Sequence, residues 1–303
     1  MVLTRMEEAL GGGILRLATL VQRRAVKAKR KLHRDRKGRV TPYLECGTAK
    51  DGTLVWLHGF SDQPDSFLRV ATALVPRYRV IAPALPGFGE GWLDPRERHT
   101  FESYASWMGE VTRAVAHDRF HLMGNSLGGA TALAIAAESC ERIDSLVPVN
   151  SAGVDMPGVH SVTHEMRDGK NLFAVRDHAS YEQLLARIFA RPPKVPRPVR
   201  RHLAAKYRRS ADWYVRVADD LGQSRVEAHG DGTSAHVDLR RISAPTLVVW
   251  GDRDTLFPLA HGEHVARTIP AARLEILEGV GHCPHLERPA KLADAFLRFA
   301  ARS

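Results

Sequence analysis

Short apolar segments alternate with amphipathic segments along most of this chain, and this alternation restricts the fold more than any other feature of the sequence. The stretch 78–85 (YRVIAPAL) is typical of a buried strand, whereas 101–115 (FESYASWMGEVTRAV) has apolar residues at helical spacing. Strands that alternate with helices favour a parallel sheet that is covered by helices on both faces. The sequence therefore predicts an α/β fold with a mostly parallel central sheet.

The same pattern predicts the order of the elements. Strands are expected at 55–60, 78–85, 120–124, 143–151, 245–251 and 273–280. Helices are expected at 65–75, 101–115, 126–139, 260–269 and 289–300.

The alternation stops in one long internal segment. Proline and arginine are abundant there, as in RPPKVPRPVRRHLAAKYRR, with helical patterns on either side. A long interruption of this kind indicates an inserted helical cap or lid. The predicted core therefore comprises 38–153 and 237–303, and the predicted cap comprises 154–236.

The N-terminal segment carries the positive charge of the protein. The 303 residues have a formal charge of +10, from 44 basic and 34 acidic residues. The stretch 16–39 alone holds eleven basic residues and one acid, Asp35, so the rest of the chain is close to neutral. Charge that is confined to one short segment does not indicate a nucleic-acid-binding protein.

Residues 14–32 have apolar side chains at helical spacing and basic side chains on the other faces. We therefore predict a basic amphipathic helix as the N-terminal domain, 1–37. Two interpretations of this helix are open. It packs on the core with a solvated basic face, or it rests on an anionic membrane or lipid surface.

Targeting signals and cysteines bear on the compartment. No apolar run reaches the ~18 residues that a membrane-spanning helix needs, and the N-terminus has acids where a secretion signal has bases. Cys46, Cys140 and Cys283 are few and widely spaced, which indicates reduced thiols. We expect a cytoplasmic protein, or one that is bound peripherally to a membrane.

One serine lies in a sequence that is typical of a sharp turn. Gly124-Asn125-Ser126-Leu127-Gly128 follows an apolar strand and begins a helix. This context matches the nucleophile elbow, in which a strained turn exposes a serine at the edge of the sheet and small neighbours avoid clashes. The alternative is a tight turn in which the serine has no chemical role.

A serine nucleophile needs a base that accepts its proton and an acid that orients the base. In a sheet of this kind both are expected at the carboxyl ends of later strands, in the order serine, acid, histidine. Asp252 and Asp254 follow one apolar strand, and His282 follows the next in a glycine-flanked loop. These distant residues support the hypothesis of a nucleophilic Ser126.

Five segments, in the same order, resemble the motifs of the α/β-hydrolase fold family. They are LHGFS at 57–61, LPGFGEG at 85–91, GNSLGG at 124–129, WGDRDTLFP at 250–258 and GHCPHLERP at 281–289. The resemblance covers roughly residues 40–303 and implies that fold, with an inserted helical cap. Within the family, the chain is most similar to monoacylglycerol-lipase-like proteins and to bacterial esterases and lipases with a helical cap.

The resemblance implies catalytic roles for the matching residues. Ser126 matches the nucleophile and His282 matches the base. The acid of the family falls on Asp254, four residues before Pro258. Asp252 fits this spacing less well, and we expect it to form hydrogen bonds within its loop.

The oxyanion of such an enzyme needs two donors, and the expected ones are the backbone N–H groups of Phe60 and Leu127. Phe60 and Ser61 are also expected to border the acyl pocket. His58 comes too early in the chain to be the base, so we expect it to hold its loop by hydrogen bonds.

Two further histidines are expected in loops or at the surface. These are His264 and His285. A zinc site at HCPH (282–285) is disfavoured, because no second ligand cluster completes it. Neither a metal nor an organic cofactor is expected.

The resemblance implies hydrolysis of a small-molecule carboxylic ester, either a medium-chain acyl ester or a monoacylglycerol, through an acyl-enzyme. One alternative is a carbon–carbon bond hydrolase of the meta-cleavage type, which shares the GNS elbow. Another is a lipid- or ligand-binding protein without catalysis on the same fold. A dehalogenase or an epoxide hydrolase is disfavoured, because those enzymes have aspartate at the position of Ser126.

Overall fold

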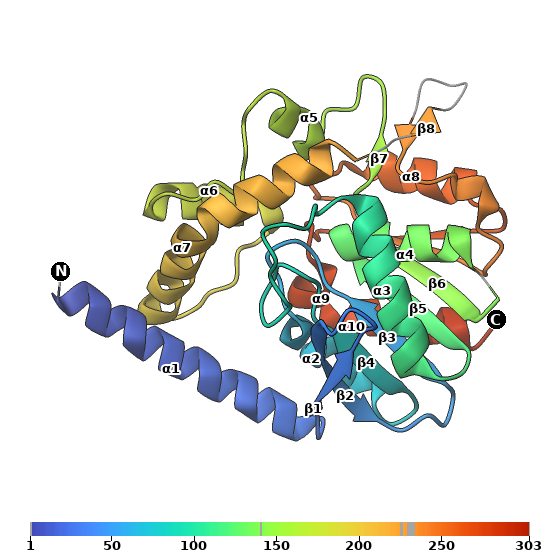
Figure 1. Ribbon diagram of the computed structural model, residues 1–303, viewed down its shortest axis with the longest axis horizontal. Coiled ribbons are helices and arrows are strands. Elements are labelled where there is room, and N and C mark those ends of the chain that lie inside the picture. The colour runs from blue at the N-terminus through green and yellow to red at the C-terminus, as the bar shows by residue number, and fades with distance from the viewer. Residues whose placement is uncertain (1, 140, 225–226, 229–233, 303) are drawn as a thin grey trace.

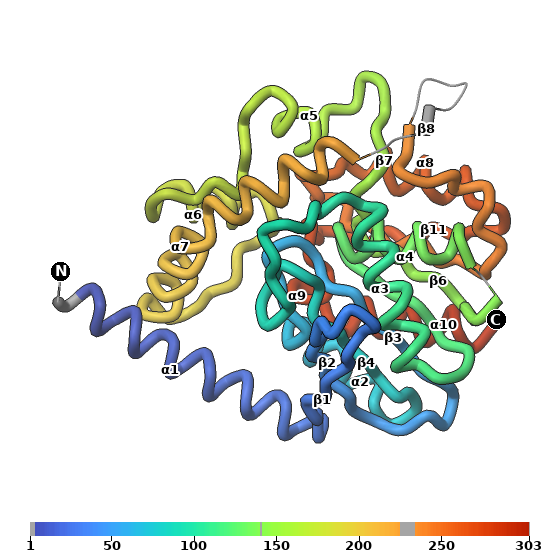
Figure 2. Tube along the Cα trace, in the orientation of Figure 1, coloured from blue at the N-terminus to red at the C-terminus, as the bar shows by residue number. Residues whose placement is uncertain are grey.

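The centre of the molecule is a mixed β-sheet that runs through the computed structural model (Figures 1 and 2). The structure describes residues 2–139, 141–224, 227–228 and 234–302. Within these residues the sheet has eight strands, which are β1 (Lys29–Arg34), β2 (Val40–Gly47), β3 (Thr53–Leu57), β4 (Arg79–Pro83), β5 (Phe120–Asn125), β6 (Ile143–Val149), β10 (Leu247–Gly251) and β11 (Arg273–Leu277).

The strand order is β1-β2-β4-β3-β5-β6-β10-β11. β2 is antiparallel to both of its neighbours, and the strands from β4 to β11 are parallel. The predicted α/β class with a mostly parallel sheet is therefore confirmed. The carboxyl ends of the parallel strands meet at one edge, which is where the sequence predicts the reacting side chains.

Helices cover both faces of the sheet, because alternate residues of each strand face opposite sides. In β3, Val55 and Leu57 belong to one hydrophobic core, and Leu54 and Trp56 belong to the other. The first core is shared with α3 (Phe101–Ala116), α4 (Leu127–Glu138) and α8 (Leu259–Thr268), and the second with α2 (Leu68–Leu74) and α10 (Pro289–Ala300). The shorter helices are η1 (Pro64–Phe67), η2 (Leu239–Arg241) and α9 (Pro284–Glu287).

The N-terminal segment differs from the predicted helix over 14–32. Helix α1 spans Val2–Ala25, and Lys29–Arg34 forms strand β1 instead. Lys27 has a φ of 52°, a left-handed conformation that does not continue a helix. The chain then pairs along the edge of β2, which satisfies the backbone groups of both strands. The prediction of a helical domain over 1–37 is therefore wrong beyond Ala25, because strand pairing overrides the helical spacing.

Between β6 and β10 the chain leaves the large sheet and crosses its carboxyl edge (Figure 1). In its described residues the segment 154–236 adds no strand to the large sheet. Pro192, Pro193 and Pro196 separate its two longest helices, since proline does not continue a helix. The elements of this cap segment are β7 (Val154–Asp155), α5 (Val162–Arg167), α6 (His178–Ile188), α7 (Arg197–Gly222), β8 (Glu227–Ala228) and β9 (Ser234–Ala235).

Helix α1 lies along the outside of the molecule and connects the cap segment to the core (Figure 1). Its first half packs on α7 so closely that a Cβ atom at Gly11 would lie 2.0 Å from the carbonyl oxygen of Pro198. Near its end, the Arg23 guanidinium donates two hydrogen bonds to Asp65, of 2.5 and 2.7 Å. Among the described residues, we find no helix with a stretch that is long and apolar enough to span a bilayer.

Candidate active site

Ser126, the predicted nucleophile, lies on a strained turn between β5 and α4. Its φ of 54° and ψ of −116° are rarely adopted by residues other than glycine. A Cβ atom at Gly124 would lie 2.2 Å from the carbonyl oxygen of Gly128, and one at Gly128 would lie 2.1 Å from that of Leu57. The turn therefore needs both glycines. Strain at a residue that lines a cavity is typical of a functional site rather than of a simple turn.

Replacement of Gly128 by alanine is expected to lower the free energy of unfolding by about 3 kcal/mol, because the new methyl group would meet rigid backbone of β3. Urea denaturation measures this change. The control is Gly13→Ala in α1, where a Cβ atom would have no neighbour within 4 Å. The control is expected to leave stability unchanged or to raise it by about 0.5–1 kcal/mol. Equal losses in the two variants would contradict the steric argument.

The predicted acid and base form a buried hydrogen-bonded pair. Nδ1 of His282 lies 2.8 Å from Oδ2 of Asp254, and the side chains are 6% and 0% exposed. The other oxygen of Asp254 accepts hydrogen bonds from the backbone N–H groups of Leu256, at 2.8 Å, and Phe257, at 3.1 Å. These donors hold the carboxylate in one orientation toward the imidazole.

Asp252, the competing acid, faces a different loop. Its Oδ1 accepts hydrogen bonds from the backbone N–H groups of Gly279, at 2.6 Å, and Val280, at 3.4 Å. The expectation that Asp252 forms hydrogen bonds within its own loop is therefore wrong, because these donors belong to the loop that follows β11. Asp254 is therefore the carboxylate that the structure places against His282.

Two asparagines connect the site, and neither was predicted from the sequence to do so. The Asn125 side-chain amide donates to the backbone oxygens of Val149, at 3.1 Å, and His282, at 3.0 Å, so it ties the serine turn to the histidine loop. The Asn150 amide donates to Oδ2 of Asp254 at 2.7 Å. Asn150 has a φ of 44° directly after β6, and an asparagine after a strand in this sequence was the only available signal.

The two expected oxyanion donors belong to the serine turn and to the loop that passes close to it. Leu127 is the first residue of α4, so its N–H has no carbonyl four residues earlier in that helix. Phe60 lies in the loop after β3, and this loop passes close to the serine turn. A Cβ atom at Gly59 would lie 3.4 Å from the Cβ atom of Ser126.

His58 holds the same loop through two hydrogen bonds of its ring. Its Nε2 accepts a hydrogen bond from the backbone N–H of Leu85 at 2.9 Å, so its Nδ1 carries the proton and donates to the oxygen of Gly59 at 2.9 Å. Complete burial lowers the pKa of His58 and favours the neutral ring. The geometry agrees with the structural role that we expected for this residue.

The expectation that His264 and His285 lie in loops or at the surface is wrong. His264 is on α8 and 6% exposed, and His285 is on α9 and fully buried. Nε2 of His285 lies 3.3 Å from Oδ2 of Asp62, and its ring packs against Trp56. Helix α9, which follows the loop of His282, packs His285 against the core. In the residues that the structure describes, no group of three metal-binding side chains is present.

Ser126 opens onto two cavities, of about 810 and 420 Å³. His282 lines the larger cavity, and Phe60 lines both. Apolar side chains dominate the smaller cavity, among them Leu127, Val154, Val162, Met166, Phe173, Leu221, Leu256 and Phe257.

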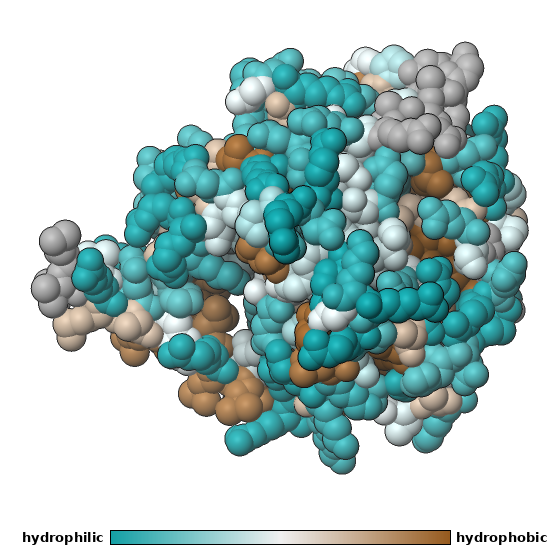
Figure 3. Space-filling model, in the orientation of Figure 1, coloured by the Kyte–Doolittle hydropathy of each residue, from teal (hydrophilic) through white to brown (hydrophobic). Residues whose placement is uncertain are grey.

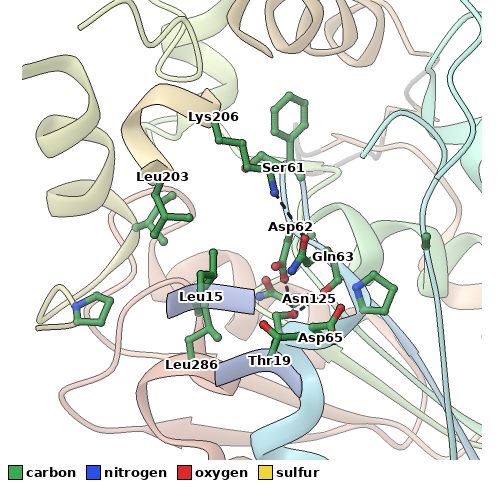
Figure 4. Close-up of a pocket in the computed structure, with 18 of the residues that line it drawn as sticks. Leu15, Thr19, Ser61, Asp62, Gln63, Asp65, Asn125, Leu203, Lys206 and Leu286 are labelled. Carbon is green, nitrogen blue, oxygen red and sulfur yellow. Dashed lines mark hydrogen bonds between the residues drawn. The ribbon is translucent and has the colours of Figure 1, made fainter. Parts of the chain in front are cut away.

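The larger cavity extends between the core and α7 toward α1, as the close-up in Figure 4 shows. Ser61 forms a hydrogen bond of 2.8 Å with the hydroxyl of Tyr207 on α7, which fixes the cap segment above the loop. Nζ of Lys206 lies 3.5 Å from Oε1 of Gln63 (Figure 4), and burial lowers the pKa of this lysine. The larger cavity thus has polar groups on the wall opposite its leucines.

The prediction of reduced thiols is confirmed for Cys46 and Cys283, whereas Cys140 lies outside the described residues. Cys283 lines the larger cavity next to His282. Burial raises the pKa of the Cys283 thiol well above its ordinary value and that of Cys46 to about 11. Neither thiol is activated as a nucleophile.

Several known proteins that are similar to this chain are lipases or esterases. Lipase 1 of Psychrobacter immobilis is 27% identical over 258 residues, which are 85% of this chain and 79% of the relative. Pimeloyl-(acyl-carrier protein) methyl ester esterase of Aeromonas hydrophila is 30% identical over 256 residues, which are 81% of this chain and 94% of the relative.

A family model and a solved structure agree with these relatives. The model described as alpha/beta hydrolase fold matches residues 52–289. The crystal structure of a membrane phospholipase A, described as a bacterial virulence factor, superposes with a TM-score of 0.88 and 28% identity. That alignment covers 97% of this chain and 92% of the other.

Proposed function

Because this chain belongs to the α/β-hydrolase fold family, we propose that it cleaves carboxylic esters with Ser126, His282 and Asp254 as its catalytic triad. The lipase and esterase relatives, which span about 85% of the chain, support a carboxylic ester hydrolase. The observation that carries the triad is the buried 2.8 Å hydrogen bond between His282 and Asp254, at the cavity that the strained Ser126 lines.

In the first half of the reaction, Oγ of Ser126 attacks the carbonyl carbon of the ester. Its proton passes to Nε2 of His282, the ring nitrogen that does not face Asp254, and the carbonyl oxygen becomes an oxyanion. When this intermediate collapses, the bond to the alkoxy oxygen breaks. The alcohol leaves with the proton from His282, and the acyl group stays on Ser126.

In the second half, water attacks the acyl-enzyme. His282 accepts a proton from this water, and the tetrahedral intermediate then collapses to the free acid while the proton returns to Ser126. Asp254 keeps Nε2 of the imidazole unprotonated in the resting enzyme and stabilises the imidazolium in each half. Asn150 assists by holding the same carboxylate oxygen of Asp254. These steps use only protein groups and water.

The backbone N–H groups of Leu127 and Phe60 are the proposed donors to the oxyanion. The positive end of the α4 dipole points at the same position and adds to the stabilisation. The strained conformation of Ser126 supports this assignment, since it places the hydroxyl and the first helical N–H at one turn.

The proposed substrates are medium-chain acyl esters or monoacylglycerols. The apolar 420 Å³ cavity beside Phe60 suits an acyl chain. The 810 Å³ cavity, which Ser61 lines, leaves room for the rest of the lipid.

A lipid substrate brings the enzyme to a lipid surface, so the proposal includes an anionic membrane or lipid surface as the partner of the N-terminal segment. The corresponding location is peripheral to a membrane. A cytoplasmic location stays a prediction from the sequence.

A fluorophosphonate probe and a series of p-nitrophenyl esters of increasing chain length test the proposed function. We expect covalent labelling of the peptide that contains Ser126, detected by mass spectrometry, and fastest turnover of medium-chain esters. Labelling together with turnover of a meta-cleavage diketone, but of no ester, would favour the carbon–carbon bond hydrolase. An unlabelled protein without turnover would favour a non-catalytic binding protein.

A further inference from the structure

The outer face of α1 carries a stripe of exposed apolar side chains. At 100° per residue, its members fall within an arc of about 120° on the helix. Apolar atoms gather along this helix in Figure 3. A continuous exposed row of this kind marks an interaction surface rather than scattered surface leucines. The stripe consists of Met6, Leu10, Ile14, Leu17, Leu20 and Val21, which are 36% to 63% exposed.

The face of α1 opposite the stripe packs against α7, so the stripe points outward. A Cβ atom at Gly12 would lie 2.7 Å from the His202 ring of α7, and Nδ1 of that ring lies 3.0 Å from the backbone oxygen of Glu8. Glu7 forms an ion pair with Arg201 of the same helix. The contacts along α7 thus leave the apolar stripe without a partner among the residues that the structure describes.

A row of arginines borders the stripe on one side. Arg5, Arg16 and Arg23 fall within about 20° of one another at the angular spacing of an α-helix. Arg23 is paired with Asp65, but the side chains of Arg5 and Arg16 have no hydrogen bond or ion pair within the described part of the chain. Unpaired cations beside an apolar stripe complement the phosphates and the acyl region of an anionic bilayer.

The cavity of Ser126 opens beside this arginine row. Leu15, Arg16, Thr19 and Leu20 of α1 line the 810 Å³ cavity, and Figure 4 shows Leu15 and Thr19 at its wall. Leu20 belongs both to the stripe and to the cavity wall. A lipid that lies against the stripe is therefore next to the wall of the cavity.

We propose that α1 docks the protein on an anionic lipid bilayer, with the stripe at the acyl boundary and the arginine row at the phosphates, and that ester lipids enter the cavity laterally past Leu20 and Arg16. A second copy of the chain is the less suitable partner, because pairing two such faces brings the unpaired arginines of both together. The entry route rests on the proposed hydrolase function, whereas the docking does not.

Vesicle flotation tests the docking with vesicles of phosphatidylglycerol and phosphatidylcholine, and with phosphatidylcholine alone. We expect binding to the anionic vesicles that weakens as the NaCl concentration rises. The variant Leu17→Gln should bind about tenfold more weakly, and Leu10→Gln/Leu17→Gln more weakly again, because each change removes one leucine from the interface. The matched control is Ile276→Gln, an exposed apolar residue on β11 at the far edge of the sheet, which should bind like the wild type.

Turnover tests whether docking delivers lipids from the bilayer to the cavity that Ser126 lines. The double variant Leu10→Gln/Leu17→Gln should hydrolyse soluble p-nitrophenyl butyrate like the wild type and lose at least about tenfold on monoacylglycerol in anionic vesicles. Equal vesicle binding by wild type and double variant would overturn the docking, as would a monomer–dimer shift in light scattering with unchanged flotation. Normal flotation without turnover of any ester would leave the docking standing and contradict the proposed function instead.

Discussion

Ser126→Ala is expected to lower kcat for ester hydrolysis by about three to six orders of magnitude, with little change in the fold. Alanine cannot form the acyl-enzyme, so any residual rate must come from direct attack of water in the same site. Kinetics with a p-nitrophenyl ester and labelling by the fluorophosphonate probe both report the loss. The methyl side chain of alanine matches Cβ of serine, so thermal unfolding is expected to stay within a few degrees of the wild type.

Ser151→Ala is the matched control for this prediction. Ser151 is also a buried serine at the carboxyl edge of the sheet, two residues after the end of β6, and its hydroxyl donates to the backbone oxygen of Ala152. This variant is expected to keep kcat within a few-fold of the wild type. A Ser126→Ala enzyme with wild-type turnover would remove Ser126 as the nucleophile.

Asp254→Asn is expected to lower kcat by about four orders of magnitude, the second-largest effect. The amide can present N–H to Nδ1 of His282, which forces the ring into the tautomer that protonates Nε2, so the base can no longer accept the proton of Ser126. The carboxylate charge that stabilises the imidazolium is lost as well. Saturation kinetics with one soluble ester measure this loss of kcat.

Asp252→Asn distinguishes the two candidate acids. Asp252 accepts hydrogen bonds from the Gly279 and Val280 N–H groups and does not contact His282, so its variant should lose stability but retain kcat within about tenfold. If Asp252→Asn lost more activity than Asp254→Asn, the assignment of the acid would be wrong. Each variant keeps the size of the side chain, so packing differences do not obscure the comparison.

The sequence predicted the parallel part of the sheet well, because each strand and helix there carries its own periodic signal. The expected strand at 120–124 and the expected helix at 126–139 correspond to β5 and α4 within one or two residues. The sequence pattern did not predict β1 and β2. Apolar and polar side chains alternate only weakly in these strands, and their pairing with each other stabilises them. The spacing of apolar residues in the N-terminal segment is a local pattern. It does not show that Lys29–Arg34 pairs with the edge of β2.

The candidate site likewise contains residues that the sequence predicted and residues that it did not. Ser126, Asp254 and His282 were found because each follows a strong strand signal, and the carboxyl ends of parallel strands converge. Asn150 was missed because a single asparagine after a strand has no distinctive spacing. The burial of His285 was missed because it depends on where α9 packs, and four residues of helix carry no periodicity of their own.

By itself the sequence determined the strand–helix alternation and the glycine-flanked serine turn, because local conformation and side-chain periodicity are properties of neighbouring residues. Only the tertiary structure decided how Asn125 ties the serine turn to the histidine loop and that Asn150 contacts Asp254. It also decided that α1 both lines the cavity and turns an apolar stripe outward. These arrangements join residues far apart in the chain, and their distances follow from packing that no local pattern encodes.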